Sequence, residues 1–194
     1  MEGTLLAKDL LPLETYAHER EGFRAEAMAH RRDRTVRVGP NAMVIFEDEL
    51  TVRYRIQEML HMGGISEDEG IQAEIDVYAR LIPNGSNLKA SFMFEFHDEV
   101  ERRTRLAQLT GVEKRVWVQI EGSSRVWAIA DEDIDRGGAN QTAPVHFLRF
   151  ELEKPMVRGL KQGSPLAIGI DHPSYSARLV LREGVRRALL SDLR

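Results

Sequence analysis

Two histidines and an aspartate are the side chains whose types and positions best suit metal or acid–base chemistry. His146 has the strand parity of Leu148 and Phe150, which predicts that its imidazole faces the core. His172 follows Asp171 at the end of a predicted strand, where the chain turns. Imidazoles and carboxylates bind divalent metals and exchange protons. If the three converge, they predict a metal-dependent enzyme; otherwise His146 is a hydrogen-bonded core residue and His172 a turn residue.

Three shorter patterns each lack the companions that their chemistry requires. Ser86 to Lys89 has the S-x-x-K spacing of serine acylases but leads into a strand, where positions three apart face opposite ways. Glu58 and His61 form one E-x-x-H pair, whereas a ferritin-like di-iron site needs two such pairs and two further glutamates. The acidic run from Asp131 to Asp135 lacks the glycine and glutamate of a calcium loop. We therefore interpret all three as structural.

Trp117 and Trp127 lie in a predicted hairpin whose turn is Gly122-Ser123-Ser124. A three-residue turn there places both indoles on one face of the hairpin. Such a pair either packs against a helix or forms an exposed surface for a small ligand, a partner or a second copy of the chain. Both interpretations stay open at this point.

The first 85 residues have mainly helical spacing of apolar positions. The patterns predict helices over 9–32, with Gly22 as a potential break, and over 49–62. Ser66 and Glu69 predict a capping box at the start of a helix that ends before Pro83. Two short strands, 35–38 and 42–46, lie between the first two helices.

From residue 86 onward the spacing of apolar residues changes from the helical period to a period of two residues, which is typical of strands. Alternation predicts strands over 88–96, 116–121, 125–130, 145–152, 166–171 and 175–181. Helical spacing predicts helices over 98–110, 154–162 and 182–193. Alternation of apolar and polar residues is typical of antiparallel strands that have one buried face and one solvent-exposed face. The sequence therefore predicts a single α+β domain, 1–194, with a mostly antiparallel sheet, an N-terminal helical region and a C-terminal helix.

Composition excludes several classes of protein. The chain has 194 residues, is 42% hydrophobic and 30% charged, and carries a net charge of -4. These values exclude disordered and collagen-like chains, and they predict neither nucleic-acid nor membrane binding. No apolar run is long enough to span a bilayer, and the first residues do not resemble a secretory signal.

The chain contains no cysteine. It can therefore form no disulfide and hold no thiolate-bound iron–sulfur cluster, so a divalent metal on histidine and aspartate is the cofactor class left open. The absence of disulfides agrees with a cytoplasmic location.

Several stretches together resemble a bacterial family known as domain of unknown function 3501. The resemblance spans nearly the whole chain, and none of the stretches is a mechanistic motif. They are Ala29-His30, Val38-Gly39-Pro40, Phe46-Glu47-Asp48, Ile56 to Leu60, Gly70-Ile71-Gln72, Leu81 to Ala90, Val116 to Gln119, Ala128 to Asp133, Val145 to Leu152 and Asp171-His172-Pro173.

This resemblance implies no activity and no catalytic residues. It does imply a genetic neighbourhood, because similar proteins are often encoded beside rubrerythrin-like di-iron proteins and iron–sulfur oxidoreductases of the heterodisulfide-reductase type. We therefore expect an accessory protein that binds a redox-protein partner or a small ligand. The alternatives are the metal-dependent enzyme built on His146, Asp171 and His172, and a homo-oligomer that uses the tryptophan hairpin.

Overall fold

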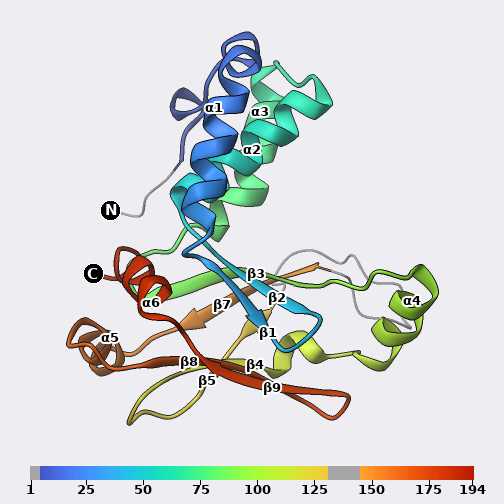
Figure 1. Ribbon diagram of the computed structural model, residues 1–194. Helices are drawn as coiled ribbons and strands as arrows, with labels where there is room; N and C mark the ends of the chain where they lie inside the picture. The colour runs from blue at the N-terminus through green and yellow to red at the C-terminus, as the bar shows by residue number, and fades with distance from the viewer. Residues whose placement is uncertain (1–4, 131–144) are drawn as a thin grey trace.

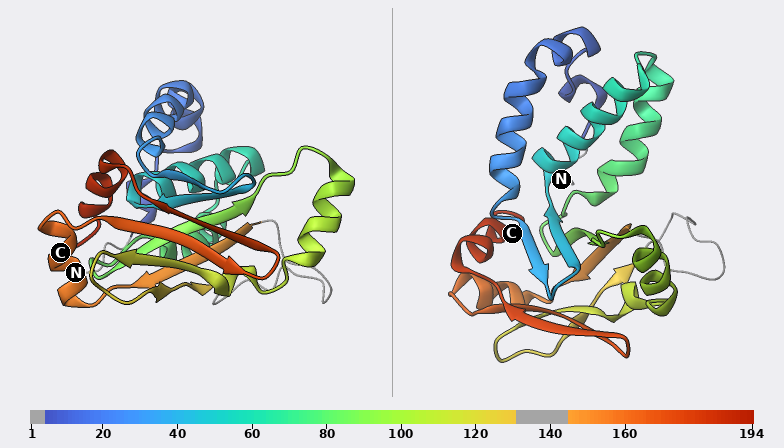
Figure 2. Two further views of the ribbon diagram at one scale, coloured as in Figure 1. Left: turned by 60° about the horizontal axis from the view of Figure 1, so that its bottom comes forward. Right: turned by 45° about the vertical axis from the view of Figure 1, so that its right-hand side comes forward.

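A helical arm stands on a two-layered β-structure in the computed structural model, which describes residues 5–130 and 145–194 (Figure 1). Three helices form the arm together with the N-terminal segment 5–12: α1 (Leu13–Arg31), α2 (Glu49–Gly63) and α3 (Asp68–Tyr78). Figure 2 shows the arm projecting from the side of the five-stranded sheet. We call its far end the arm tip: there α1 begins, α2 ends and α3 begins.

The first layer is a five-stranded antiparallel sheet, ordered β1-β2-β3-β7-β6. Its strands are β1 (Thr35–Val38), β2 (Ala42–Glu47), β3 (Asn87–Phe94), β7 (Val145–Glu151) and β6 (Ile129–Ala130). The alternation predicted for β3 is present, since Leu88, Ala90 and Phe92 face the main core. Ser91 on the opposite face is also fully buried, because the arm covers this part of the sheet.

The second layer is a four-stranded antiparallel sheet, ordered β5-β4-β8-β9. Its strands are β5 (Val126–Trp127), β4 (Val116–Ile120), β8 (Leu166–His172) and β9 (Tyr175–Val180). Sequence patterns predicted one strand over 125–130, and this was wrong. The chain instead leaves the second sheet after Trp127 and enters the first at Ile129, so the two layers are joined at this side.

Tyr175 fastens the two sheets together at the opposite side. Its hydroxyl donates to the carbonyl oxygen of Val38 at 2.8 Å and accepts the backbone N–H groups of Asn41 and Ala42, each at 3.1 Å. Gly39 lies in this β1–β2 turn with φ 80°, and a Cβ added there would lie 2.6 Å from the tyrosine oxygen. The turn therefore requires glycine for its backbone conformation and for the tyrosine.

Shorter helices close the ends of the β-structure (Figure 1). They are α4 (Glu99–Gln108), α5 (Lys154–Lys161), α6 (Glu183–Leu190) and the 3-10 turn η3 (Val112–Arg115), whereas the 3-10 turns η1 (Ala7–Asp9) and η2 (Ala79–Leu81) belong to the arm. No helix within the described ranges is long and apolar enough to cross a membrane. The α+β fold, with its N-terminal helical region and C-terminal helix, is confirmed.

Two predictions about the arm helices were wrong. Gly22 does not divide α1, which runs from Leu13 to Arg31, because a glycine inside a helix costs only about 0.5–1 kcal/mol relative to alanine. Ser66 does not cap α3, because that helix begins at Asp68 and Glu67 stands at its N-cap without a side-chain hydrogen bond.

The arm has an apolar core of its own. Leu10 from the N-terminal segment packs with Ile56 and Leu60 of α2 and with Ile75 of α3. Phe147, on the outer face of β7, packs against the same cluster and continues it onto the sheet. The main core fills the space between the two sheets.

Candidate functional site

His146 is buried, as its strand parity predicted. It lies on β7 opposite Phe92 of β3, with 5% of its surface exposed. Its ring stacks on that of Phe92, with the centroids 6.2 Å apart. The residue therefore lies on the core-facing side of the first sheet.

Asp171 and His172 end strand β8 of the second sheet. The Nε2 atom of His172 lies 3.2 Å from the carbonyl oxygen of Thr110, and its Nδ1 accepts the N–H of Ser174 at 3.1 Å. These contacts suit the neutral imidazole with its proton on Nε2, and they occupy both ring nitrogens. Asp171 is exposed and pairs with Arg125 at 3.1 Å.

The structure thus places the three predicted residues on two different sheets. Across residues 5–130 and 145–194, no three histidine, aspartate or glutamate side chains are grouped so as to hold a metal ion. The metal-dependent enzyme at His146, Asp171 and His172 stays a prediction. The acidic run 131–135 lies outside the described residues.

Trp117 and Trp127 face each other across the β4–β5 pair, on the outer face of the second sheet. Trp117 lies flat on Gly169, where a Cβ would come within 2.3 Å of the indole. The guanidinium of Arg125 covers Trp117 at 4.2 Å from the ring centroid. No described helix lies over this face (Figure 2). Trp117 therefore packs against Gly169 and Arg125 rather than against a helix, which was one of the two interpretations left open by the sequence.

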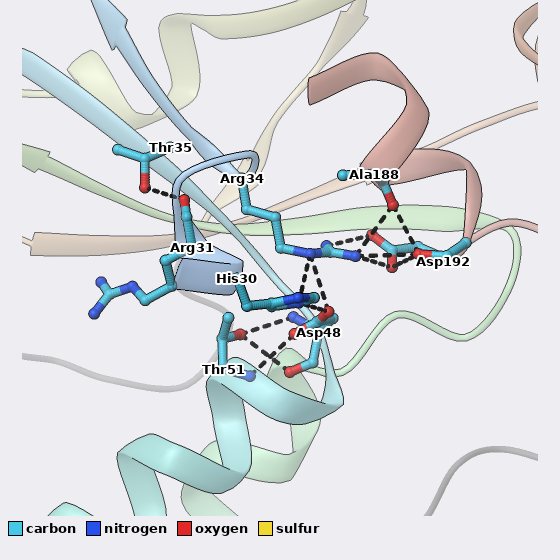
Figure 3. Close-up of polar contacts among 9 residues, drawn as sticks. His30, Arg31, Arg34, Thr35, Asp48, Thr51, Ala188 and Asp192 are labelled. Carbon is cyan, nitrogen blue, oxygen red and sulfur yellow. Dashed lines mark hydrogen bonds and ion pairs between the residues drawn. The ribbon is translucent and has the colours of Figure 1, made fainter. Parts of the chain in front are cut away.

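A buried arginine fastens the base of the arm to the rest of the molecule. Arg34 follows α1, and its guanidinium makes a bidentate ion pair with Asp192, just beyond α6, at 2.8 and 2.9 Å (Figure 3). Its Nε lies 3.0 Å from Asp48, whose other carboxylate oxygen caps α2 by accepting the N–H of Thr51. His30 completes the group, with Nε2 2.5 Å from Asp48. Arg34 thus connects the end of α1, the start of α2 and the C-terminal segment.

The charge of Arg34 is maintained by its partners. Burial, the largest single influence, lowers the pKa of the guanidinium. The hydrogen bonds and charge of Asp192 and the charge of Asp48 together outweigh burial and raise this pKa above its usual value. Arg34 therefore remains a cation although only 1% of its side chain is exposed.

Arg55 fastens α2 to the outer face of the first sheet. Its Nη2 donates to the buried carboxylate of Glu47 at 2.5 Å and to Ser91 at 3.0 Å. The same guanidinium stacks on the rings of Tyr78 from α3 and Phe147 from β7, 5.6 and 5.5 Å from their centroids. Arg34 and Arg55 thus both join the base of the arm to the rest of the molecule.

A third polar group connects α1 and α2 along the arm. The Tyr16 hydroxyl donates to Glu58 at 2.7 Å, and Arg20 donates to both oxygens of the same carboxylate at 2.8 and 2.9 Å. Hydrogen bonding from Arg20, with help from Tyr16, lowers the pKa of Glu58 to about 2 against the effect of burial. The E-x-x-H glutamate is therefore a structural ion-pair residue.

We expect Glu58 to make the free energy of unfolding depend on pH. Its pKa is lower in the folded chain than the 4.5 of the free side chain, so the unfolded chain binds the extra proton between those values. The stabilisation that ionised Glu58 gives to the folded chain is complete above pH 4.5 and is lost as the pH falls toward 2. Urea unfolding should show the destabilisation by Glu58→Gln shrinking over that window, whereas the exposed control Glu26→Gln stays near zero throughout. A Glu58→Gln effect independent of pH would contradict this assignment.

The arm tip contains a cavity of about 470 Å³. Its walls are mainly aliphatic and come from all parts of the arm: Leu10, Leu11, Leu13, Leu60, Ile65 and Ile71. Polar side chains also line it, namely Glu14 and Thr15 from α1 and Ser66 and Asp68 at the start of α3. A largely apolar cavity of this size with a few polar groups is typical of a binding site.

Gln57 holds one wall of this cavity in place. Its buried side-chain amide accepts the N–H of Leu11 at 2.5 Å and donates to the carbonyl oxygen of the same residue at 3.3 Å. These two hydrogen bonds hold the N-terminal segment against α2, and both Gln57 and Leu11 line the cavity.

Sequence patterns did not identify the residues that orient the arm. Asp48 has a local signal, since an aspartate before a helical run with Thr51 three residues later is an N-cap pattern. Arg34 has none, because its partner Asp192 is 158 residues away in the chain. The cavity likewise depends on three segments that only folding brings together.

The comparisons agree with the resemblance found in the sequence. Residues 4–193 match the family described as proteins of unknown function, DUF3501. A crystal structure of a protein of unknown function from Burkholderia pseudomallei K96243 is 46% identical, and the match covers 98% of this chain and 100% of that chain with a TM-score of 0.94. No curated protein matches the chain. The chain therefore belongs to the DUF3501 family.

Proposed function

We propose that this protein is a cytoplasmic accessory protein that acts by binding, and that the helical arm is the part that contacts its partner. One observation carries the proposal: the arm projects from the β-structure, and buried contacts of Arg34 and Arg55 hold its base. An element held in one orientation loses little conformational entropy when it binds. The cavity at the tip supplies a contact surface at the most accessible end of the arm.

The proposed partner is a redox protein, either a rubrerythrin-like di-iron protein or an iron–sulfur oxidoreductase. The family resemblance in the sequence supports this choice. The composition supports a binding role in such a system, because a chain without cysteine carries no thiolate-bound cluster and relays no electrons through a dithiol.

Site-specific cross-linking tests both parts of the proposal. A photoreactive phenylalanine analogue is placed at Met62, which is 72% exposed near the end of α2, or at Val180, which is 53% exposed on β9. Each variant is mixed with the purified rubrerythrin-like and iron–sulfur proteins encoded in the same genome. We expect cross-links from Met62 and none from Val180.

Two outcomes would contradict the proposal. If neither redox protein forms a complex at about 100 µM, where even weak specific contacts are detectable, the redox partner is wrong. If a complex forms but cross-links only through Val180, the arm is not the binding element.

A further inference from the structure

The arm tip is acidic as well as apolar. Residues 5–14 and 64–70 contain five carboxylates and one lysine, Lys8. The carboxylates are Asp9, Glu14, Glu67, Asp68 and Glu69. Asp9 accepts the N–H of Leu6, and in the described part of the chain none of the five is in an ion pair.

Helix dipoles account for only part of this charge. Glu14 lies in the first turn of α1 and Asp68 and Glu69 in the first turn of α3, where a carboxylate interacts favourably with the helix N-terminus. That interaction leaves most of the negative potential facing solvent, because the helix end carries only about half a unit charge. Glu14 and Asp68 in addition line the apolar cavity.

Apolar side chains are also exposed at the arm tip outside the cavity. Leu6, which precedes η1, is 44% exposed, and Met62 near the end of α2 is more exposed still. The five carboxylates are spread over three elements, η1, α1 and the start of α3. Apolar and charged groups distributed over several elements fit a length of polypeptide better than they fit one small molecule.

We infer that the arm tip binds a basic segment of a partner protein, in which a bulky aliphatic or aromatic side chain enters the cavity and flanking lysines or arginines lie against Glu14 and Asp68. This inference rests on the proposed function, because it identifies the partner chemistry that the arm would recognise. The cavity provides the apolar anchor and the carboxylates provide selectivity for basic sequences.

Peptide selection on the full chain tests the inference and requires no particular partner protein. A phage-displayed library of random dodecapeptides is panned against the protein, and the enriched peptides are synthesised and titrated by fluorescence anisotropy. We expect enrichment of peptides with leucine, isoleucine, methionine or phenylalanine next to lysine or arginine. Affinity should fall as salt rises, because exposed charges are screened. No enrichment, or enrichment of acidic peptides, would overturn the inference.

Matched variants locate the peptide. Thr15→Trp fills the cavity, whereas Ala17→Trp places the same side chain on an exposed part of α1 outside it. We expect the first to weaken binding more than tenfold and the second less than twofold. If Thr15→Trp shifts the melting temperature, Ser66→Trp at the cavity rim replaces it. Equal effects of cavity and control variants would place the peptide elsewhere and overturn the inference.

A second pair of variants tests the charges. Glu14→Gln with Asp68→Asn and Glu19→Gln with Glu26→Gln alter the net charge equally, but only the first pair lines the cavity. We expect the first pair to weaken binding about tenfold at low salt and the second less than twofold, since two exposed charge contacts contribute on that order. Equal effects would show a general attraction to negative charge and contradict the assigned site.

The inference and the proposed function can fail separately. A partner that cross-links at Met62 but is unaffected by Thr15→Trp overturns the cavity's role and leaves the arm as the binding element. If peptides bind at the tip but no redox protein cross-links there, the proposed function is overturned. The inference that the cavity binds basic segments with an apolar side chain then remains. Titration with hexylamine covers the remaining occupant: saturable binding of the amine without any selected peptide would assign the cavity to a small molecule and overturn the inference.

Discussion

Replacing Arg34 with methionine is expected to lower the free energy of unfolding by about 3–5 kcal/mol, because it leaves a buried carboxylate without its cation. Asp192 is 5% exposed and makes both of its short contacts with Arg34. Asp48 loses the same cation at the start of α2. Urea unfolding measures the loss. The control is Arg37→Met, whose ion pair with Glu95 lies in solvent and should contribute less than about 1 kcal/mol.

A double variant separates the charge from the packing. Adding Asp192→Leu to Arg34→Met removes the unpaired carboxylate and should restore part of the lost stability, because a buried ion pair and an apolar pair of similar volume are often equivalent. Two results would contradict this role of Arg34 as the partner of a buried carboxylate. One is a loss of unfolding free energy with Arg34→Met no larger than with Arg37→Met, and the other is a double variant less stable than Arg34→Met alone.

The same variant should loosen the arm. The chain has no cysteine, so spin labels can be attached at Met62→Cys and Val180→Cys without background. We expect the distribution of distances between these labels to be narrow in the wild type and broader with Arg34→Met, since Arg34 joins α1 and α2 to the C-terminal segment. An unchanged distribution would show that Arg55 and the apolar contacts hold the arm alone.

Replacing Gly39 with alanine is expected to destabilise the protein by about 3 kcal/mol, from backbone strain of about 1–2 kcal/mol together with displacement of Tyr175. The residue has φ 80°, and the new Cβ would meet the tyrosine hydroxyl that joins the two sheets. Gly122 provides a matched control, because its φ is also 80° but nothing lies within 4 Å of a Cβ there. Gly122→Ala should therefore destabilise the protein by about 1–2 kcal/mol, which is the backbone strain alone.

Tyr175→Phe tests the cause of the difference. Without the hydroxyl, the alanine at position 39 meets one fewer obstacle, and its extra cost relative to position 122 should shrink. Thermal or urea unfolding of the four proteins in this cycle, namely the wild type, the two single variants and the double variant, gives the coupling energy between Gly39 and Tyr175. Equal costs at positions 39 and 122 in the wild-type background would contradict the role of Tyr175 in joining the sheets.

Local patterns predicted most elements to within two residues. Strand β1 begins and ends where the sequence placed it, at Thr35 and Val38, and α5 begins at Lys154 as expected. These predictions succeed because apolar periods of 2 and 3.6 residues are properties of the backbone itself. The predicted strand 125–130 failed because a change of sheet at Ala128 leaves the local pattern unaltered.

The candidate site was less predictable than the fold. His146 was correctly expected to be buried, since parity along a strand is local information. Its convergence with Asp171 and His172 could not be judged from the sequence, because the three belong to strands of different sheets. The arm-tip cavity was not anticipated either, because its lining comes from separate segments of the chain.

The sequence by itself determined the α+β class, the order of helices and strands, the membership of a family and the absence of cysteine chemistry, because each of these depends on composition or on neighbouring residues. Only the tertiary structure decided that Arg34 meets Asp192, that Tyr175 joins the two sheets and that leucines from three segments line a cavity at the arm tip. Such contacts join residues far apart in the chain, and their partners are selected by packing and burial rather than by any local preference.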